Sequence, residues 1–469
     1  MGSLRLSVAC VVTLVAGCTA LGPDYRAPGA GELSVPASWH GGAPAGASVP
    51  ADLAAWWRTL GDATLDELIA AALAANPDLK VAQARLREAR VRRDVALAGR
   101  FPTIGASASA SRTRAEAGAG SSRSAYDAGL DASWEPDIFG GRRRGIEAAG
   151  ADLEAAVEDM RATQVALAAE VALNYVQVRA LQARLGIARA NLGTQSETLQ
   201  LTQWRAQAGL TSSLDVEQAR AAVEQTRAQV PSLESSLAGA RNRLAILAGA
   251  PPGALDARLA ATAAIPAVPD PIAIGIPADT LRQRPDLRAA ERRLAAETAR
   301  IGQREAERFP SLSIGGSIGV ESLTLGSLLE REAIVGRLVA RLAATLFDGG
   351  RLRSQVEAQS AVRERALHSY EAAVLTALED VENALAQLAN ARLRLEALAN
   401  AADAARNAAI YAEHRYSAGI TDFQTVLDTQ RTLLSAQDNL KSTEAEQASA
   451  LIRLYKALGG GWDPAGAAP

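Results

Sequence analysis

The longest stretch without a helix-breaking residue runs from Arg351 to Ala418 and contains neither glycine nor proline. Between Leu367 and Ala409 its apolar positions recur about every 3.5 residues, which is the repeat of a coiled-coil seam. At a rise of 1.5 Å per residue, a single helix over this stretch is about 100 Å long. Because a compact domain cannot hold such a helix, the sequence predicts an elongated protein.

The residues after this stretch predict a sharp reversal of the chain. Gly419 is the residue type that most readily adopts the left-handed backbone that ends a helix. The sequence from Thr421 to Gln424 fits a capping box, which satisfies the first backbone N–H groups of a new helix. We therefore expect a second helix that returns along the first and forms a very long helical hairpin.

The sequence is a tandem duplication. Residues 76–79 and 101–104 match residues 284–287 and 309–312 at an offset of 208, and residues 205–216 match residues 415–426 at an offset of 210. The duplication predicts a first repeat over 64–250, a Pro-rich linker over 251–277, a second repeat over 278–459 and a C-terminal tail over 460–469. Each repeat has the order helix, extended segment, very long helix, turn and helix.

The N-terminal residues 1–17 are typical of an export signal, with an apolar run that is too short to span a bilayer. The sequence from Val15 to Cys18 resembles a bacterial lipobox, in which Cys18 becomes the acylated first residue. An ordinary signal peptide with a chance cysteine is the alternative. Residues 18–63 then form an acylated N-terminal tether. Because the second cysteine lies inside the signal, the mature chain would have no free thiol and no disulfide. We expect no cofactor except the covalent lipid on Cys18.

Composition narrows the classes of partner. The net charge is −3, which argues against nucleic acid. Aromatic residues make up only 4% of the chain and alanine is abundant, which favours closely packed helices over a bulky globular core. Since no apolar run reaches the length of a transmembrane helix, any part that spans a membrane is expected to be strand.

The segments 101–139 and 309–347 lack helical periodicity and alternate apolar with polar residues. This pattern predicts two β-hairpins, each with one apolar and one polar face. Aromatic residues at the bases of these hairpins would form a girdle at a membrane interface, and they are Phe101, Trp134, Phe139, Phe309 and Phe347. A soluble hairpin packed on the helices is the alternative.

Four strands cannot close a barrel, and open strand edges are not tolerated in hydrocarbon. Several chains must therefore pool their strands, and a homotrimer gives twelve. The water-lined polar face of this barrel would carry Asp127, Asp131, Arg337 and Arg341. The predicted fold class is thus a membrane α+β protein, with a trimeric twelve-stranded barrel and a long helical coiled-coil barrel below it.

An enzyme is a weaker interpretation. Residues 315–319 fit the G-x-S-x-G pattern of a hydrolase nucleophile elbow, which requires a strand, a sharp turn and a helix around the serine. Here Ser317 lies inside a predicted strand and no helix follows directly. With three histidines in the chain there is no metal-ligand spacing either.

Five segments together resemble the TolC-like outer-membrane efflux proteins, in the OprM/NodT-type lipoprotein branch, and they are residues 17–25, 57–62, 76–79, 346–351 and 415–419. The resemblance implies a trimer in the bacterial outer membrane, lipid-anchored and extending into the periplasm as an α-helical barrel. It would be the exit duct of a tripartite efflux pump that exports small molecules and drugs. A periplasmic adaptor and an inner-membrane transporter of the resistance-nodulation-division type would feed it.

The same resemblance suggests where the duct closes and where it meets its adaptor. The periplasmic gate would involve Asp428, Gln424, Arg415 and Tyr416, although Asp428 could equally be a surface carboxylate paired with Arg431. The adaptor would contact the two hairpin tips, which are Gly209, Leu210, Thr211, Gly419, Ile420 and Thr421; the glycines could also be structural caps alone. The chain departs from the family pattern in Arg337 and Arg341 and in Gln424, where relatives place a bulky apolar residue. A periplasmic coiled-coil lipoprotein that acts as a pump adaptor is the alternative function.

Overall fold

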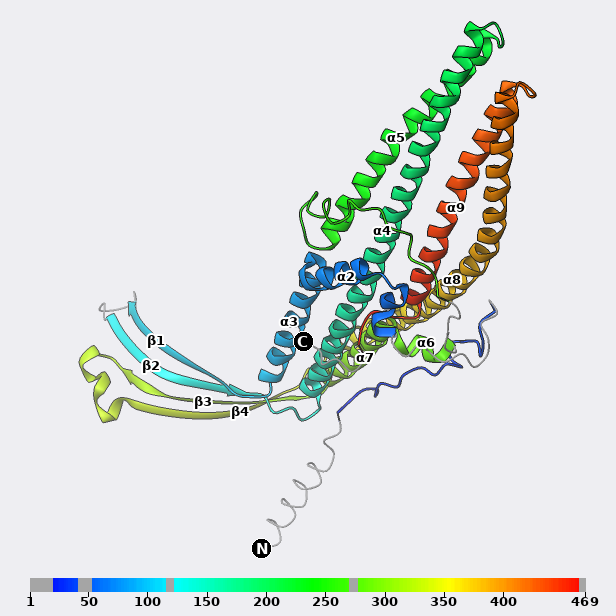
Figure 1. The fold of residues 1–469 in the computed structure, drawn as a ribbon. Coiled ribbons are helices and arrows are strands. Elements are labelled where there is room, and N and C mark those ends of the chain that lie inside the picture. The colour runs from blue at the N-terminus through cyan, green and yellow to red at the C-terminus, as the bar shows by residue number, and fades with distance from the viewer. Residues whose placement is uncertain (1–19, 41–52, 115–121, 270–276, 464–469) are drawn as a thin grey trace. The chain divides into compact units, whose positions relative to one another are not determined.

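The computed structural model describes residues 20–40, 53–114, 122–269 and 277–463 (Figure 1). The predicted signal peptide, Cys18 and parts of the predicted tether, linker and tail lie outside these ranges. The chain divides into two compact units. The first comprises residues 1–29, 85–157 and 289–371, and the second comprises residues 30–84, 158–288 and 372–469.

The first unit contains one antiparallel sheet of four strands in the order β1-β2-β3-β4. The strands are β1 (Thr103–Arg114), β2 (Ser122–Trp134), β3 (Ser311–Ser322) and β4 (Ile334–Ala343). Two short 3-10 helices, η2 (Leu325–Leu329) and η3 (Arg331–Ala333), connect β3 to β4. The two predicted hairpins are therefore present, and pairing of β2 with β3 joins them into one sheet.

A pair of glycines allows β2 and β3 to approach each other closely where the two hairpins meet. Gly129 on β2 lies directly opposite Gly319 on β3. A Cβ atom on Gly319 would approach the Ala128 carbonyl oxygen to 2.6 Å and the Gly129 Cα to 2.8 Å. Any larger residue at position 319 would push the two strands apart.

Most of the helical residues belong to two long helical hairpins. In the first, α4 (Gly141–Gln207) turns into α5 (Ser213–Leu247), and in the second, α8 (Arg351–Ser417) turns into α9 (Phe423–Ala457). Helices α4 and α8 begin in the first unit and continue in the second. The prediction of one unbroken helix from Arg351 is confirmed. Its buried residues include Val374, Val381, Leu388, Ala402 and Ala409, which belong to the predicted seam.

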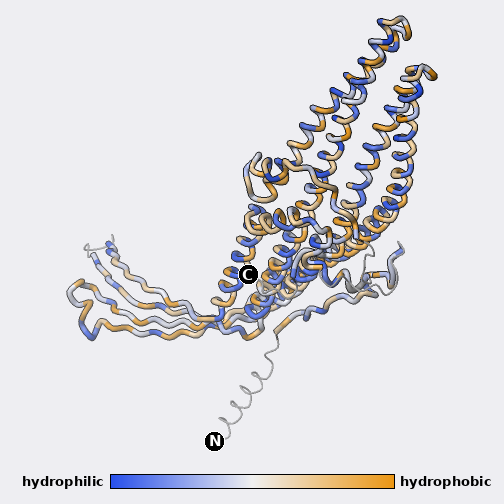
Figure 2. The backbone as a smooth tube through the Cα atoms, in the orientation of Figure 1, coloured by the Kyte–Doolittle hydropathy of each residue, from blue (hydrophilic) through white to orange (hydrophobic). Residues whose placement is uncertain are grey.

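Shorter helices complete the two units, and they are η1 (Leu53–Leu60), α2 (Ala63–Ala75), α3 (Pro77–Ala98), α6 (Pro277–Gln283) and α7 (Pro285–Ala306). Polar and apolar residues alternate along the helices (Figure 2). Within the part of the chain that the structure describes, none of the helices combines the length and the apolar character needed to cross a membrane.

The repeated motif at residues 76–79 and 284–287 has an equivalent role in both halves of the second unit. The Asn76 side-chain amide donates to the Leu247 carbonyl oxygen at the end of α5, at 2.9 Å. The Arg284 guanidinium donates to the Ala457 carbonyl oxygen at the end of α9, at 3.1 Å. In each repeat the motif thus ties the start of a shorter helix, α3 or α7, to the end of a return helix, and satisfies one of its orphan carbonyls.

Candidate functional site

The register of the sheet separates its residues into two faces. Ile104 lies opposite Ala132, Leu130 opposite Ile318, and Ile314 opposite Ala340, so apolar side chains from all four strands share one face. This face is exposed: Ile104, Ile318 and Leu338 retain 74%, 62% and 82% of their accessible surface. A continuous exposed apolar surface of this kind marks a contact with lipid or with another protein.

The opposite face of the sheet is polar. Asp127 and Asp131 accept hydrogen bonds from Ser109 and Ser107 on the neighbouring strand. Ser317 lies between Asp131 and Arg337 in the middle of β3. Because Ser317 is inside a strand and not at a strand-to-helix turn, the local geometry is not that of a nucleophile elbow.

The predicted girdle residues lie at the bases of the strands but differ in their contacts. Phe139 and Phe309 stack on each other, with ring centroids 4.9 Å apart. The Trp134 indole N–H donates to the Arg100 carbonyl oxygen at 2.9 Å. Phe101 and Phe347 are exposed, at 69% and 91%. Phe139 and Phe309 therefore pack against each other within the single chain. Phe101 and Phe347 are free to contact lipid or another chain.

The segment just after the predicted lipidation site is fixed near the base of the sheet. The buried Arg144 guanidinium on α4 donates to the carbonyl oxygens of Leu21 and Gly22, at 3.0 and 3.2 Å, and to Asp24 at 2.7 Å. The Leu21 N–H donates to the Phe139 carbonyl oxygen at 3.3 Å. Although Cys18 is outside the described residues, the chain three residues later lies beside Phe139.

The two hairpin tips share one backbone geometry. Gly209 and Gly419 have φ angles of 75° and 76°. The N–H groups of Leu210 and Ile420 donate to the carbonyl oxygens of Arg205 and Arg415, both at 2.8 Å, which completes a Schellman motif at each tip. Leu210 and Ile420 are exposed at 69% and 65%, so each tip presents one apolar side chain.

The helix that follows each tip begins differently. In the first repeat, Ser212 caps α5 and forms a capping box with Asp215. The hydrogen bond from Thr211 is the largest influence on Asp215 and holds the pKa of its carboxyl below the ordinary value. Thr211 is half-buried.

In the second repeat, the predicted capping box of Thr421 with Gln424 is wrong. Asp422 is the N-cap of α9 and accepts a hydrogen bond from the Thr425 N–H at 2.9 Å. A carboxylate competes successfully for this position because it accepts charge-assisted hydrogen bonds from backbone N–H groups. Gln424 takes no part in the cap, and its side-chain amide donates to the Asp428 carboxylate at 3.0 Å.

The predicted gate residues occupy two different environments. Asp428, Gln424 and Arg415 are exposed. The partner of Asp428 in the described residues is Gln424, and not Arg431 as the surface interpretation required. Tyr416 is only 3% exposed and belongs to an apolar cluster between the hairpins with Phe423, Val426 and Leu427.

Arg205 is the residue at the tips that sequence reasoning missed. Its guanidinium lies 4.6 Å from the centroid of the Tyr416 ring and donates to the Tyr416 carbonyl oxygen at 2.6 Å. Arg205 and Arg415 match in the duplication, yet only Arg205 points inward. Their identical position in the last turn of a helix gave no signal of this difference, because it depends on which neighbouring hairpin each helix faces.

Further polar contacts connect the two hairpins along their length. Arg184 on α4 pairs with Asp438 on α9 at 2.6 and 3.1 Å. The Gln430 side chain donates to Thr198 at 3.0 Å, and both residues are buried. These contacts and the Arg205 contact with Tyr416 hold α4 against the second hairpin.

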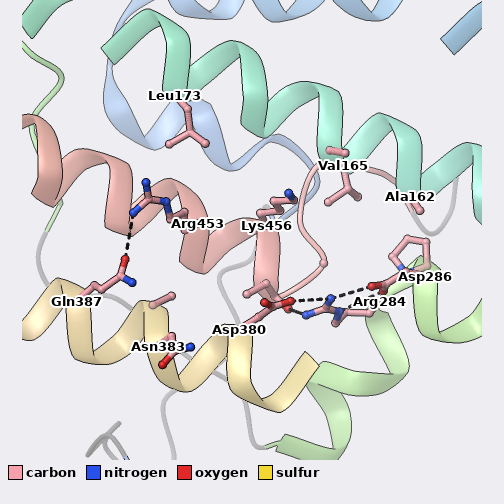
Figure 3. Close-up of a pocket in the computed structure, with 15 residues that line it drawn as sticks. Ala162, Val165, Leu173, Arg284, Asp286, Asp380, Asn383, Gln387, Arg453 and Lys456 are labelled. Carbon is pink, nitrogen blue, oxygen red and sulfur yellow. Dashed lines mark hydrogen bonds and ion pairs between the residues drawn. The ribbon is translucent and has the colours of Figure 1, made fainter. Parts of the chain in front are cut away.

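A pocket of about 570 Å³ lies in the second unit (Figure 3). Arg284 forms ion pairs there with Asp286 at 2.7 Å and with Asp380 at 3.2 Å. Burial alone would raise the pKa of Asp286, but the hydrogen bond and charge of Arg284 outweigh it and lower that pKa. The arrangement is an ion-pair network that joins α7 to α8. In the described ranges, no cluster of three or more histidine, cysteine or acidic residues is placed to hold a metal ion.

Comparison with known proteins identifies the relatives of the whole chain. A family model described as "Outer membrane efflux protein" matches residues 68–250 and 276–460. The chain is 34% identical over 474 residues to the toluene efflux pump outer membrane protein TtgF of Pseudomonas putida, covering 98% of this chain and 97% of the relative. It is 34% identical over 469 residues to the pyoverdine export outer membrane protein OpmQ of Pseudomonas aeruginosa, covering 96% of this chain and 97% of the relative.

Solved structures with similar folds are also outer-membrane channels. The chain superposes on the structure of the outer-membrane channel OprN with a TM-score of 0.89. The two sequences are 37% identical, and the match covers 95% of this chain and all of that chain. The similarity includes both the strands and the long helices, since so little of either chain is left unmatched.

Proposed function

This chain belongs to the outer membrane efflux protein family, and we propose that three copies of it pool their strands into one twelve-stranded barrel. The predicted family and the predicted fold class, long helices joined to a membrane β-sheet, are confirmed. The protein is the outer-membrane exit duct of an efflux system and extends into the periplasm. The family consists of channel and efflux proteins and not of enzymes.

The open four-stranded sheet is the observation that supports the trimer. In one chain, β1 and β4 each leave one edge unpaired. An unpaired edge in hydrocarbon costs several kcal/mol for each unsatisfied backbone group. Pairing β4 of one copy with β1 of the next satisfies both edges and, with three copies, closes a barrel of a size that leaves a water-filled lumen.

The two faces of the sheet supply the environments that such a barrel requires. The apolar face carries Ile104, Leu130 and Ile318 toward lipid, and the polar face carries Asp127 and Arg337 toward the lumen. An adaptor with long helical hairpins has no need of this exposed apolar sheet, which is why the duct is the better interpretation of the same helices.

The hairpin tips are the proposed contact with a periplasmic adaptor, which links the duct to an inner-membrane transporter of the resistance-nodulation-division type. The exposed side chains of Leu210 and Ile420 support this assignment, because they are apolar and project from rigid turns. The relatives named above export toluene and pyoverdine. For this chain we propose export of small molecules through the same kind of duct.

The proposed periplasmic gate uses the second hairpin. Three copies of Asp428 would form a ring of negative charge around the axis, and Gln424 orients the carboxylate by its hydrogen bond. The contacts of Arg205 with Tyr416 support this gate because they fix the second hairpin to the first. The acyl group proposed on Cys18 would anchor the segment that Arg144 holds beside Phe139.

Two experiments test the proposal. Native mass spectrometry of the C18A variant in detergent should give a trimer, whereas a water-soluble monomer would contradict the barrel. Cysteines introduced at Thr211 and Thr421 should crosslink to the adaptor in cells. Crosslinks to the adaptor that form only from cysteines in the strands would reverse the assigned polarity.

A further inference from the structure

The charged side chains of the polar sheet face lie on separate rows of the register. From the strand ends at Trp134 and Ala343 toward the hairpin loops, these rows are Arg341 with Ser313, Arg337 with Ser317 and Asp131, and Glu321 with Asp127. The first row is positive, the second contains one charge of each sign, and the third contains two negative charges. The charge along this face therefore changes sign from one end of the strands to the other.

The end at Arg341 is the periplasmic end. Strand β4 finishes two residues after Arg341, at Ala343, and the chain then continues into α8. Each row is four residues from the next, so Arg341 and Asp127 are separated by about 27 Å along the strand direction. The Debye length is about 10 Å at 0.1 M salt, so that the two ends of the lumen have separate electrostatic potentials.

Among the paired residues of the sheet, no carboxylate shares the Arg341 row, and Asp131 is the one carboxylate on the Arg337 row. Neither Arg337 nor Arg341 forms an ion pair in the described part of the chain. Strand β1, which would pair with β4 of the next copy, contains no aspartate or glutamate. Barrel closure therefore adds no counter-charge beside the arginines. Both side chains line one hollow of about 330 Å³ on the polar face, together with Asp131.

The acidic row is equally unbalanced. Asp127 lies directly opposite Glu321 on the neighbouring strand, an arrangement that is destabilising for two like charges. Ser109 donates a hydrogen bond to Asp127 but brings no positive charge. Arg123 lies four residues before Asp127 on β2, closer to the hairpin loops. Because the pairing of β2 with β3 stops at Tyr126 and Ser322, Arg123 lies beyond the four-stranded part of the sheet.

We propose that the lumen has a basic collar of Arg341 side chains at its periplasmic end and an acidic ring of Asp127 and Glu321 side chains toward the outside. The basic collar favours entry of anionic solutes from the periplasm over cationic solutes of the same size. This inference rests on the proposed trimeric duct, because only that assembly turns the polar face into a lumen.

The size of the effect follows from the geometry. Twelve strands spaced about 4.8 Å apart and tilted by about 40° give a backbone radius of about 12 Å, so each guanidinium lies within about 10 Å of the axis. Three unit charges at that distance, screened over one Debye length in water, change the local concentrations of an anion and a cation in opposite directions. The ratio of anion to cation changes by about fourfold.

Thiol modification measures this ratio directly. Ser313 pairs with Arg341, and Ser109 pairs with Asp127, so the S313C and S109C variants place a probe at each end of the lumen. Both are made in trimers purified in detergent, at 0.1 M salt. Each is treated separately with the anionic sulfonatoethyl and the cationic trimethylammonioethyl methanethiosulfonate. We expect the anionic-to-cationic rate ratio to be at least fourfold higher at position 313 than at position 109.

Second substitutions identify the source of the difference. R341Q in the S313C background should lower the ratio at position 313 about fourfold, whereas R341K should preserve it because the charge remains. R112Q is the matched control, since Arg112 belongs to the same sheet but alternates onto the other face. It should leave both ratios unchanged.

The outcomes separate this inference from the proposed duct. If an A128C probe on the apolar face reacts as fast as S313C in membrane-embedded protein, lipid does not cover that face and the duct itself is wrong. If A128C is protected but R341Q leaves the ratio at position 313 unchanged, the duct stands and the basic collar is refuted. Loss of the ratio in R341K as well as in R341Q would also refute it, because a charge effect does not require a guanidinium.

Discussion

The close approach of the N-terminal segment to α7 gives the sharpest prediction. Gly22 lies against Gly302, and a Cβ atom on Gly302 would approach the Leu21 carbonyl oxygen to 2.5 Å and the Arg144 Cγ to 2.9 Å. Such contacts are shorter than real Cβ atoms make with backbone. We therefore expect G302A to force the segment around Leu21 away from the helix, because α7 is fixed by its own backbone hydrogen bonds.

The magnitude comes from the contacts that the segment would lose. Arg144 donates to the carbonyl oxygens of Leu21 and Gly22, and each hydrogen bond from a charged donor contributes about 1.5 to 3 kcal/mol. The ion pair with Asp24 adds little, because the Asp24 side chain is 88% exposed. Taking the lower value for each of the two bonds, G302A should make opening of the segment easier by about 3 kcal/mol, which is roughly 150-fold in its equilibrium.

Limited trypsin digestion in detergent measures this opening. Arg26 lies in the same segment, and cleavage after it tracks the open population when closing is faster than cleavage. G145A is the matched control, because a Cβ at Gly145 on α4 would meet only the Gln303 side chain at ordinary contact distances of 3.6 to 3.8 Å. Cleavage after Arg26 should be much faster in G302A and within about twofold of wild type in G145A. Equal rates in the two variants would refute the reasoning.

Three further predictions concern the hairpin tips. R205Q removes the contact with the Tyr416 ring and should raise single-channel conductance in planar bilayers by loosening the second hairpin; an unchanged conductance would show that Arg205 is only a structural contact. D422A should speed hydrogen exchange in the first turn of α9 at neutral pH. The hydrogen bonds from Thr425 hold the pKa of Asp422 below its ordinary value, so the ionised carboxylate stabilises the start of α9 fully above the ordinary carboxyl pKa. This stabilisation is lost as the pH falls through the lowered pKa of Asp422. A difference in exchange between D422A and wild type that persists in acid would contradict this role of Asp422. D428N and D428A should raise both conductance and the vancomycin sensitivity of cells, and no change in either variant would leave Asp428 as an ordinary surface carboxylate.

The backbone of the tips shows how local sequence can be sufficient. Glycine at positions 209 and 419 adopts the left-handed conformation at little cost, so the end of each long helix was predictable from one residue type. The start of the next helix was not, because Thr421 and Asp422 both qualify as N-caps by residue type. Only the observed backbone decides which side chain reaches the free N–H groups.

The sequence by itself determined the secondary structure and the faces of the strands. A long run without glycine or proline, with apolar residues every 3.5 positions, predicts a continuous helix. Alternation along residues 104–110, 126–134, 312–320 and 336–342 assigns each side chain of these strands to one of two faces. These are short-range properties, and they follow from backbone sterics and from the two periodicities of helix and strand. The duplication then gave the same order of elements in both halves.

The tertiary structure decided which distant residues meet. The pairing of β2 with β3 converts two hairpins into one sheet and places Asp131, Ser317 and Arg337 on one row. The packing of α4 against the second hairpin turns Arg205 toward Tyr416 while its duplicate Arg415 faces outward. Two copies of one motif acquire different roles because a side chain's environment is set by the neighbouring element, and local sequence carries no information about that neighbour.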